Sequence, residues 1–79
     1  MSPTIFRYKS YRFFFFSREE TRAHVHVYCN DGEAKFWIEP KVELAKNWGF
    51  SNELIKELLI VIEEHRDEIA NAWKKHFEG

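Results

Sequence analysis

The chain has 79 residues and a formal net charge of −1, so we expect a single domain over residues 1–79. A charge near zero gives no general attraction to nucleic acid or to an anionic membrane. The one cysteine, Cys29, excludes an internal disulfide and a multi-cysteine zinc site. No apolar run is long enough to span a membrane and no leader pattern is present, so we expect a cytoplasmic protein.

Two aromatic-rich strands are predicted first, over Thr4–Tyr8 and Tyr11–Phe16. A two-residue turn at Lys9-Ser10 would pair Tyr8 with Tyr11, Phe6 with Phe13, and Ile5 with Phe14. The same register sets Arg7 opposite Arg12, a like-charge pair that costs stability unless an anion or an acid lies between them. The run Phe13–Phe16 is apolar at every position and must therefore be buried on both sides.

A hairpin is predicted next, around Asp31-Gly32. This dipeptide between alternating residues is typical of a two-residue type I′ turn. The register that follows puts six apolar residues on one face, pairing Cys29 with Ala34, Val27 with Phe36, and Val25 with Ile38. On the opposite face it pairs Tyr28 with Lys35, His26 with Trp37, and His24 with Glu39. The apolar face is the predicted core face.

A short connector over residues 42–49 and a long helix complete the predicted fold. Gly49 suits a tight turn or a helix end, and Ser51 is a good N-cap. Apolar residues then recur at helical spacing up to Phe77. A straight helix over 52–77 would be roughly 40 Å long, longer than a globule of this size, about 30 Å across. It therefore either bends near His65-Arg66 or extends onto a second subunit. The fold class is α+β: a four-stranded antiparallel β-meander, a connector and one long amphipathic C-terminal helix.

His24 and His26 are the first candidates for chemistry, because residues two apart on a strand point to the same side. Because histidine titrates near neutrality, two imidazoles at this spacing can serve as an acid/base pair that cleaves RNA, with Arg12 or Lys35 steadying a phosphate. They can also supply half of a metal site. A purely structural pair is the third possibility. We favour no metal and expect no cofactor.

The same face carries candidate binding residues, namely Tyr28, Trp37 and Glu39. Aromatic and cationic side chains together are typical of single-stranded nucleic-acid platforms and of protein interfaces. The protein interface is the preferred interpretation because the chain as a whole is not basic. The basic side chains are nevertheless concentrated near the start, with five basic and two acidic residues in 1–22, so that end could face an acidic partner.

Four motifs stand out along the chain: Pro3-Thr4-Ile5-Phe6-Arg7, Tyr11-Arg12-Phe13-Phe14-Phe15, His24-Val25-His26-Val27 and the segment from Gly32 to Pro40. Together they resemble an uncharacterised bacterial family, domain of unknown function family 4160. The resemblance implies that His24 and His26 belong to the family signature, but it carries over no established activity. The chain departs from the family at Arg22-Ala23, where members usually place a proline, and at Lys9-Ser10, which replaces a Lys-Gly turn.

Members of that family often stand beside another small protein in gene pairs suspected of being toxin–antitoxin modules. The chain has eight Phe, three Tyr and three Trp, more aromatic surface than one small core needs. This surplus, the overlong helix and the gene setting implied by the resemblance together predict an interaction module that binds a cognate small protein and forms a homodimer. The alternative is a small metal-independent ribonuclease-like toxin that uses His24 and His26, with RNA as its partner. A histidine metal-binding protein is the third alternative, and the residues leave open whether the chain is an enzyme.

Overall fold

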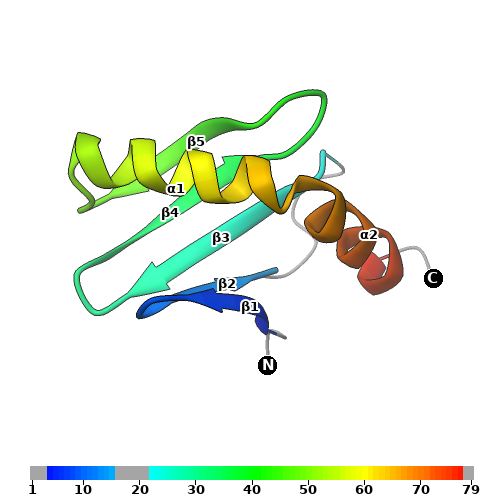
Figure 1. The fold of residues 1–79 in the computed structure, drawn as a ribbon, viewed down its shortest axis with the longest axis horizontal. Coiled ribbons are helices and arrows are strands. Elements are labelled where there is room, and N and C mark those ends of the chain that lie inside the picture. Colours follow the sequence, from blue (N-terminus) through cyan, green and yellow to red (C-terminus); the bar gives the residue numbers. More distant parts are fainter. Residues whose placement is uncertain (1–3, 16–21, 78–79) are drawn as a thin grey trace.

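The computed structural model describes residues 4–15 and 22–77. Within them lie five strands and two helices in the order βββββαα (Figure 1). The elements are β1 (Thr4–Tyr8), β2 (Tyr11–Phe14), β3 (His24–Cys29), β4 (Gly32–Trp37), β5 (Glu43–Trp48), α1 (Asn52–Glu64) and α2 (Arg66–Phe77). The strands form one antiparallel sheet in sequence order. The α+β class and the meander are confirmed, whereas the expected four strands and one helix were wrong. The predicted strand end at Phe16 and residues 17–21 lie outside the described part.

The predicted connector forms a fifth strand, β5, at one edge of the sheet. It pairs with β4 from Trp48, opposite Glu33, to Glu43, opposite Trp37, with a bulge in between. Most of its side chains are exposed. An edge strand of this kind carries little of the hydrophobic alternation by which a strand is recognised. Gly49 then turns the chain with a φ of 101°, as the tight-turn prediction required.

The predicted helix is divided at His65 into α1 and α2. Of the two alternatives for this segment, a bend or a straight helix extending onto a second subunit, the bend is correct. The backbone N–H of His65 is shared between the carbonyls of Val61 and Ile62, and Ile69 N–H donates to the His65 carbonyl. Ser51 caps α1 as predicted, with its hydroxyl accepting a bond from Leu54 N–H. The bend keeps the longest dimension of the molecule at 34 Å.

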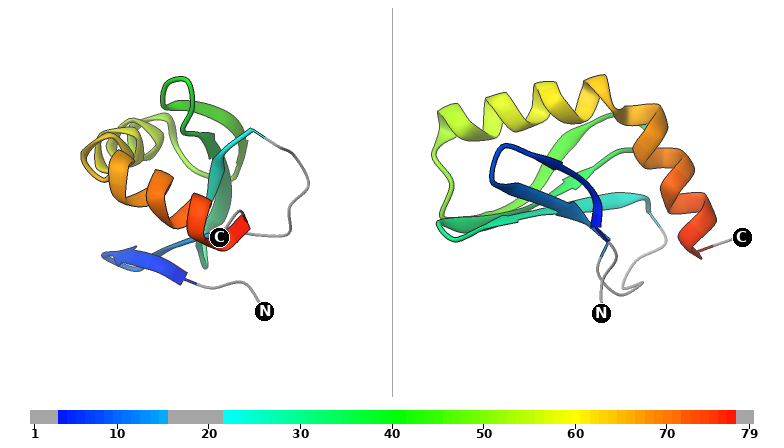
Figure 2. Two further views of the ribbon diagram at one scale, coloured as in Figure 1. Left: turned by 90° about the vertical axis from the view of Figure 1, so that its right-hand side faces the viewer. Right: turned by 60° about the horizontal axis from the view of Figure 1, so that its bottom comes forward.

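The two helices cover different parts of the sheet. In Figure 2, α1 runs along one face, while α2 turns across the end of the sheet where β3 begins. The apolar side of α1 packs on the predicted core face of the β3–β4 hairpin. All six residues predicted for that face are buried in one cluster with α1 and α2: Val25, Val27, Cys29, Ala34, Phe36 and Ile38.

The turn of the β3–β4 hairpin differs from the prediction by a shift of two in register. Cys29 lies opposite Gly32, so Asn30 and Asp31 form the turn. Positive φ is confined, among the described residues, to Lys9 and Gly49, so the turn is not type I′. Gly32 serves a different purpose, because a Cβ there would lie 2.5 Å from the carbonyl oxygen of Trp48. A shift of two keeps every side chain on its predicted face but changes its partner.

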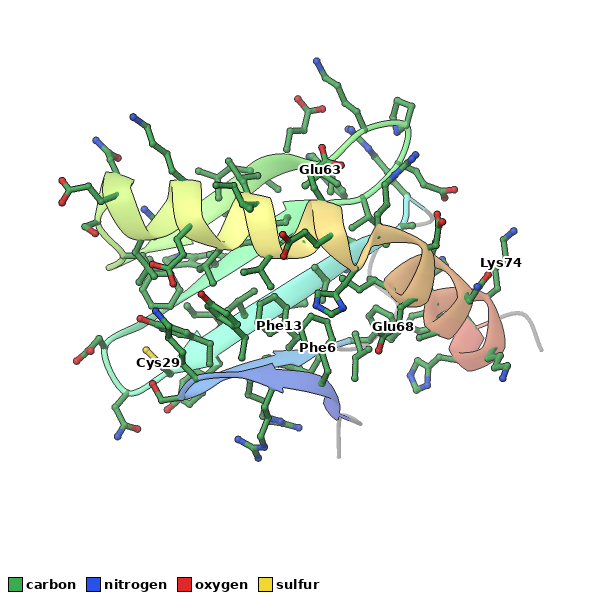
Figure 3. All side chains as sticks on the ribbon, in the orientation of Figure 1. Phe6, Phe13, Cys29, Glu63, Glu68 and Lys74 are labelled. Carbon is green, nitrogen blue, oxygen red and sulfur yellow. The ribbon has the colours of Figure 1, made fainter. Side chains whose placement is uncertain are left out.

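The β1–β2 hairpin largely follows the predicted register. Tyr8 pairs with Tyr11, Phe6 with Phe13, and Arg7 with Arg12. Lys9 takes a φ of 55° at the turn. An irregularity between Thr4 and Phe6 puts Thr4, and not Ile5, opposite Phe14. Figure 3 shows Phe6 and Phe13 on the side of the hairpin that faces α1, where their rings stack 4.4 Å apart.

Phe14 lies on the other face of the sheet and is only 8% exposed. The ring of His26 stacks on it at 5.4 Å, and the Arg12 guanidinium lies 4.7 Å from its centroid. The neighbouring Phe13 and Phe15 are buried as well. The prediction of burial on both sides is thus confirmed for Phe13–Phe15, and side chains of the same chain help to cover the outer side.

Candidate functional site

The face of the sheet turned away from α1 carries the candidate residues, arranged in rows across the strands. Residues directly opposite each other in antiparallel strands point to the same side. The register therefore aligns one residue from each strand in a row that we call the cross-sheet row: Arg7, Arg12, Tyr28, Glu33 and Trp48. A second row holds Phe14, His26, Lys35 and Lys46, and a third holds His24, Trp37 and Glu43.

His24 is enclosed at the end of the sheet that α2 covers. Its side chain is 1% exposed, with its ring centroid 4.9 Å from that of Trp73 and 5.8 Å from that of Trp37. Nδ1 lies 2.8 Å from the carbonyl oxygen of Arg22. Because a carbonyl can only accept, Nδ1 must carry the proton in this bond. Contacts on several sides fix the orientation of the ring.

His26 is also enclosed, with 5% exposure. It lies opposite Lys35 and Phe14, not opposite Trp37 as expected. Its Nδ1 is 3.4 Å from a Glu33 carboxylate oxygen, and its ring centroid is 5.4 Å from that of His24. The two imidazoles are therefore neighbours, as the strand spacing predicted. Their enclosure leaves little surface for a substrate and favours a structural role.

Trp37 and Glu39, expected to face His26 and His24, are placed differently. Trp37 lies opposite His24, and its ring is flanked by the Arg22 guanidinium at 4.4 Å and by the Lys35 ammonium at 4.8 Å. Glu39 lies beyond the end of β4, where its carbonyl accepts a bond from Arg22 Nε. The expected His24–Glu39 pair was wrong because of the two-residue shift in register.

The two cations proposed as alternatives to steady a phosphate lie on different strands, Arg12 on β2 and Lys35 on β4. Lys35 is 7% exposed and lies over Trp37. Arg12 is half-buried in the cross-sheet row and lies over Phe14. Arg12, and not Lys35, borders a surface pocket of about 470 Å³ between the tips of the two hairpins. The pocket is lined by Arg7, Ser10, Arg12, Tyr28, Cys29, Asn30 and Asp31.

Tyr28 and Trp48 are the large exposed aromatic residues of the cross-sheet row, at 46% and 50% exposure. Tyr28 was predicted as a binding residue, and its exposure agrees with that role. Trp48 was not predicted, because it was placed in a connector. The signal that could have found it is its spacing of two from Lys46, which puts both on one side once the segment is read as a strand.

A hydrogen-bonded clamp ties the hairpin tip that carries Arg7 and Arg12 to α1. The Tyr8 hydroxyl and the Lys9 ammonium both donate to Glu57 Oε2, at 2.7 and 2.8 Å. The bonds from Lys9 and Tyr8 lower the pKa of the Glu57 carboxyl. The same carboxylate raises the pKa of Lys9 and of Tyr8. The clamp therefore holds the cationic end of the cross-sheet row in a defined position.

Within residues 4–15 and 22–77, His, Cys, Asp and Glu side chains form no group of three or more that could hold a metal ion. Cys29, which is buried, accepts a bond from Asp31 N–H at 3.4 Å.

Comparison with known proteins places the chain in a family. The family model described as Domain of unknown function (DUF4160) matches residues 10–74. The chain belongs to this family. The DUF4160 match includes Arg12, Tyr28 and Trp48 of the cross-sheet row and begins after Arg7. No curated protein and no solved structure matches the chain. Neither described helix of this DUF4160 domain has the length and apolar character needed to cross a membrane.

Proposed function

We propose that this DUF4160 domain is a small interaction module that binds a cognate small protein through the cross-sheet row. The observation that carries the proposal is the row itself, which runs over all five strands and exposes Tyr28 and Trp48 beside two arginines. Tyrosine, tryptophan and arginine are the residues that contribute most to binding energy at protein interfaces. The suspected toxin–antitoxin setting of the family makes the product of the neighbouring gene the partner to test.

The size of the surface supports this proposal. Neighbouring strands are about 4.8 Å apart, so a row over five strands is roughly 19 Å long. A partner lying along it would cover the two exposed aromatic rings as well as the arginine end. The cytoplasm would be the setting for such an encounter, with the buried Cys29 kept reduced.

Co-expression with the product of the neighbouring gene tests the proposal. A Tyr28→Ser/Trp48→Ser variant should lose co-purification with that protein. The matched control is Leu44→Ser/Ile60→Ser, which removes two other exposed apolar side chains, at 39% and 61% exposure, and should retain it. Loss of binding in the control but not in the first variant would contradict the proposal.

Self-association was also predicted, partly because a straight helix would project beyond the domain. The bend at His65 removes that argument. Many of the aromatic residues are moreover buried in the chain's own core, among them Phe13, Phe15 and Trp73. The homodimer stays a prediction, and a mass from light scattering tests it.

A further inference from the structure

Two arginines occupy directly opposite positions at one end of the cross-sheet row. Arg7 on β1 lies directly opposite Arg12 on β2, and both line the pocket of about 470 Å³. Like charges placed directly opposite on a sheet are destabilising. The register that juxtaposes them is fixed by the Phe6–Phe13 stack on the other face and by the Tyr8–Lys9–Glu57 clamp. The fold thus holds two like charges together at a surface pocket.

The other pocket residues add hydrogen-bond donors. Tyr28 and Ser10 supply hydroxyl groups and Asn30 supplies an amide. Among the described residues of the lining, Asp31 is the one carboxylate beside two arginines, so the formal charge of these side chains is positive. A carboxylate accepts two parallel bonds from a guanidinium fork, a geometry that favours arginine over lysine.

We infer that this pocket binds a carboxylate of an acidic segment in a partner protein, with Arg7 and Arg12 as its ligands. The inference rests on the proposed function and specifies the chemistry of the partner. A polypeptide is favoured over an isolated ion because the row continues from the pocket through Tyr28 and Glu33 to Trp48. A length of roughly 19 Å accommodates about six residues of extended chain.

The test uses the full chain and three probes: a fluorescently labelled hexaglutamate peptide, the matching hexaglutamine peptide, and inorganic phosphate. Anisotropy should detect hexaglutamate binding and no hexaglutamine binding. Arg7→Gln/Arg12→Gln should weaken hexaglutamate binding about tenfold or more, as expected when charged hydrogen bonds are lost. Lys41→Gln/Lys56→Gln removes the same charge from exposed positions outside the pocket and should change binding less than about twofold, because distant exposed charges are screened.

A conservative variant guards against a merely unfolded protein. Arg7→Lys/Arg12→Lys keeps the charge but loses the guanidinium fork, so it should melt like the parent chain and still bind hexaglutamate more weakly. The inference would be overturned if Arg7→Gln/Arg12→Gln and Lys41→Gln/Lys56→Gln weakened hexaglutamate binding equally. Failure of the parent chain to bind hexaglutamate would also overturn it. Tighter binding of inorganic phosphate than of hexaglutamate would also overturn it and assign the pocket to phosphate. If the cognate protein binds through Trp48 but Arg7→Gln/Arg12→Gln leaves hexaglutamate binding unchanged, this inference fails and the proposed function stands.

Discussion

Gly32 lies so close to Trp48 that a single added carbon at Gly32 would approach the Trp48 carbonyl oxygen to 2.5 Å. The contact is with backbone, which cannot rotate away as a side chain would. Gly32→Ala should therefore destabilise the protein by about 2 kcal/mol, in the range for overpacking. Urea unfolding measures the change. Lys46 is an exposed position on β5, the edge strand that carries Trp48. The stability of Lys46→Ala should stay within about 0.5 kcal/mol of the parent. Equal stability of Gly32→Ala and the parent would refute the close approach.

Stability should depend on acid pH through Glu57. The bonds from Lys9 and Tyr8 lower its pKa in the folded state, so the unfolded chain takes up this proton first. The clamp's contribution to the free energy of unfolding is therefore fully present above the unfolded-state carboxyl pKa of about 4.3. It is lost as the pH falls through the lowered folded-state pKa. Melting temperatures from neutral pH to about pH 3 should fall less for Glu57→Gln than for the parent. Glu63→Gln, an exposed carboxylate on the same helix, should keep the parent's slope. A parent-like slope in Glu57→Gln would show that the clamp contributes nothing in solution.

The opposed arginines should cost the free protein stability. Arg7→Gln is expected to raise the free energy of unfolding by about 0.5 kcal/mol at low ionic strength, because like charges opposite each other on a sheet repel. The gain should shrink near 1 M salt, where the Debye length is about 3 Å. Arg7→Lys keeps the charge and should show no gain. A loss of stability in Arg7→Gln at low salt would mean that the arginine pair does not strain the free protein.

The enclosed histidine His24 should matter for stability whatever its other roles. His24→Ala removes a ring packed between Trp37 and Trp73 and the bond to the Arg22 carbonyl. The expected loss is about 2 kcal/mol or more, from a cavity and an unpaired carbonyl. His76→Ala, on the exposed side of α2, should cost less than about 0.5 kcal/mol. The ribonuclease-like alternative is disfavoured by the burial of His24. It would be supported if His24→Ala kept the parent's stability but abolished a toxic effect on growth.

Much of the fold could be predicted because local signals agreed with one another. The alternation through Val25 and Val27 identified the core face, and Ser51 marked the start of α1. The turn residues could not be predicted, because Gly32 is required by the Trp48 backbone, a partner sixteen positions away whose strand was not recognised. β5 itself was missed because an exposed edge strand has little hydrophobic pattern.

The candidate site was predicted in part. The common face of His24, His26 and Tyr28 follows from strand periodicity alone and holds in the structure. The enclosure of both histidines could not be predicted, since it depends on Trp73 of α2 reaching the end of the sheet and on Phe14 of β2 lying beside His26. The cross-sheet row required the register of all five strands, and its Trp48 end became visible only with β5.

The most direct test of the cross-sheet row as a binding face is a titration of ¹⁵N-labelled protein with the product of the neighbouring gene, followed by amide and indole chemical shifts. We predict that the largest changes fall on Arg7, Arg12, Tyr28 and Glu33 and on the Trp48 indole N–H. Changes centred instead on the exposed side of α1 around Ile60, with the Trp48 indole signal unmoved at saturation, would contradict the account.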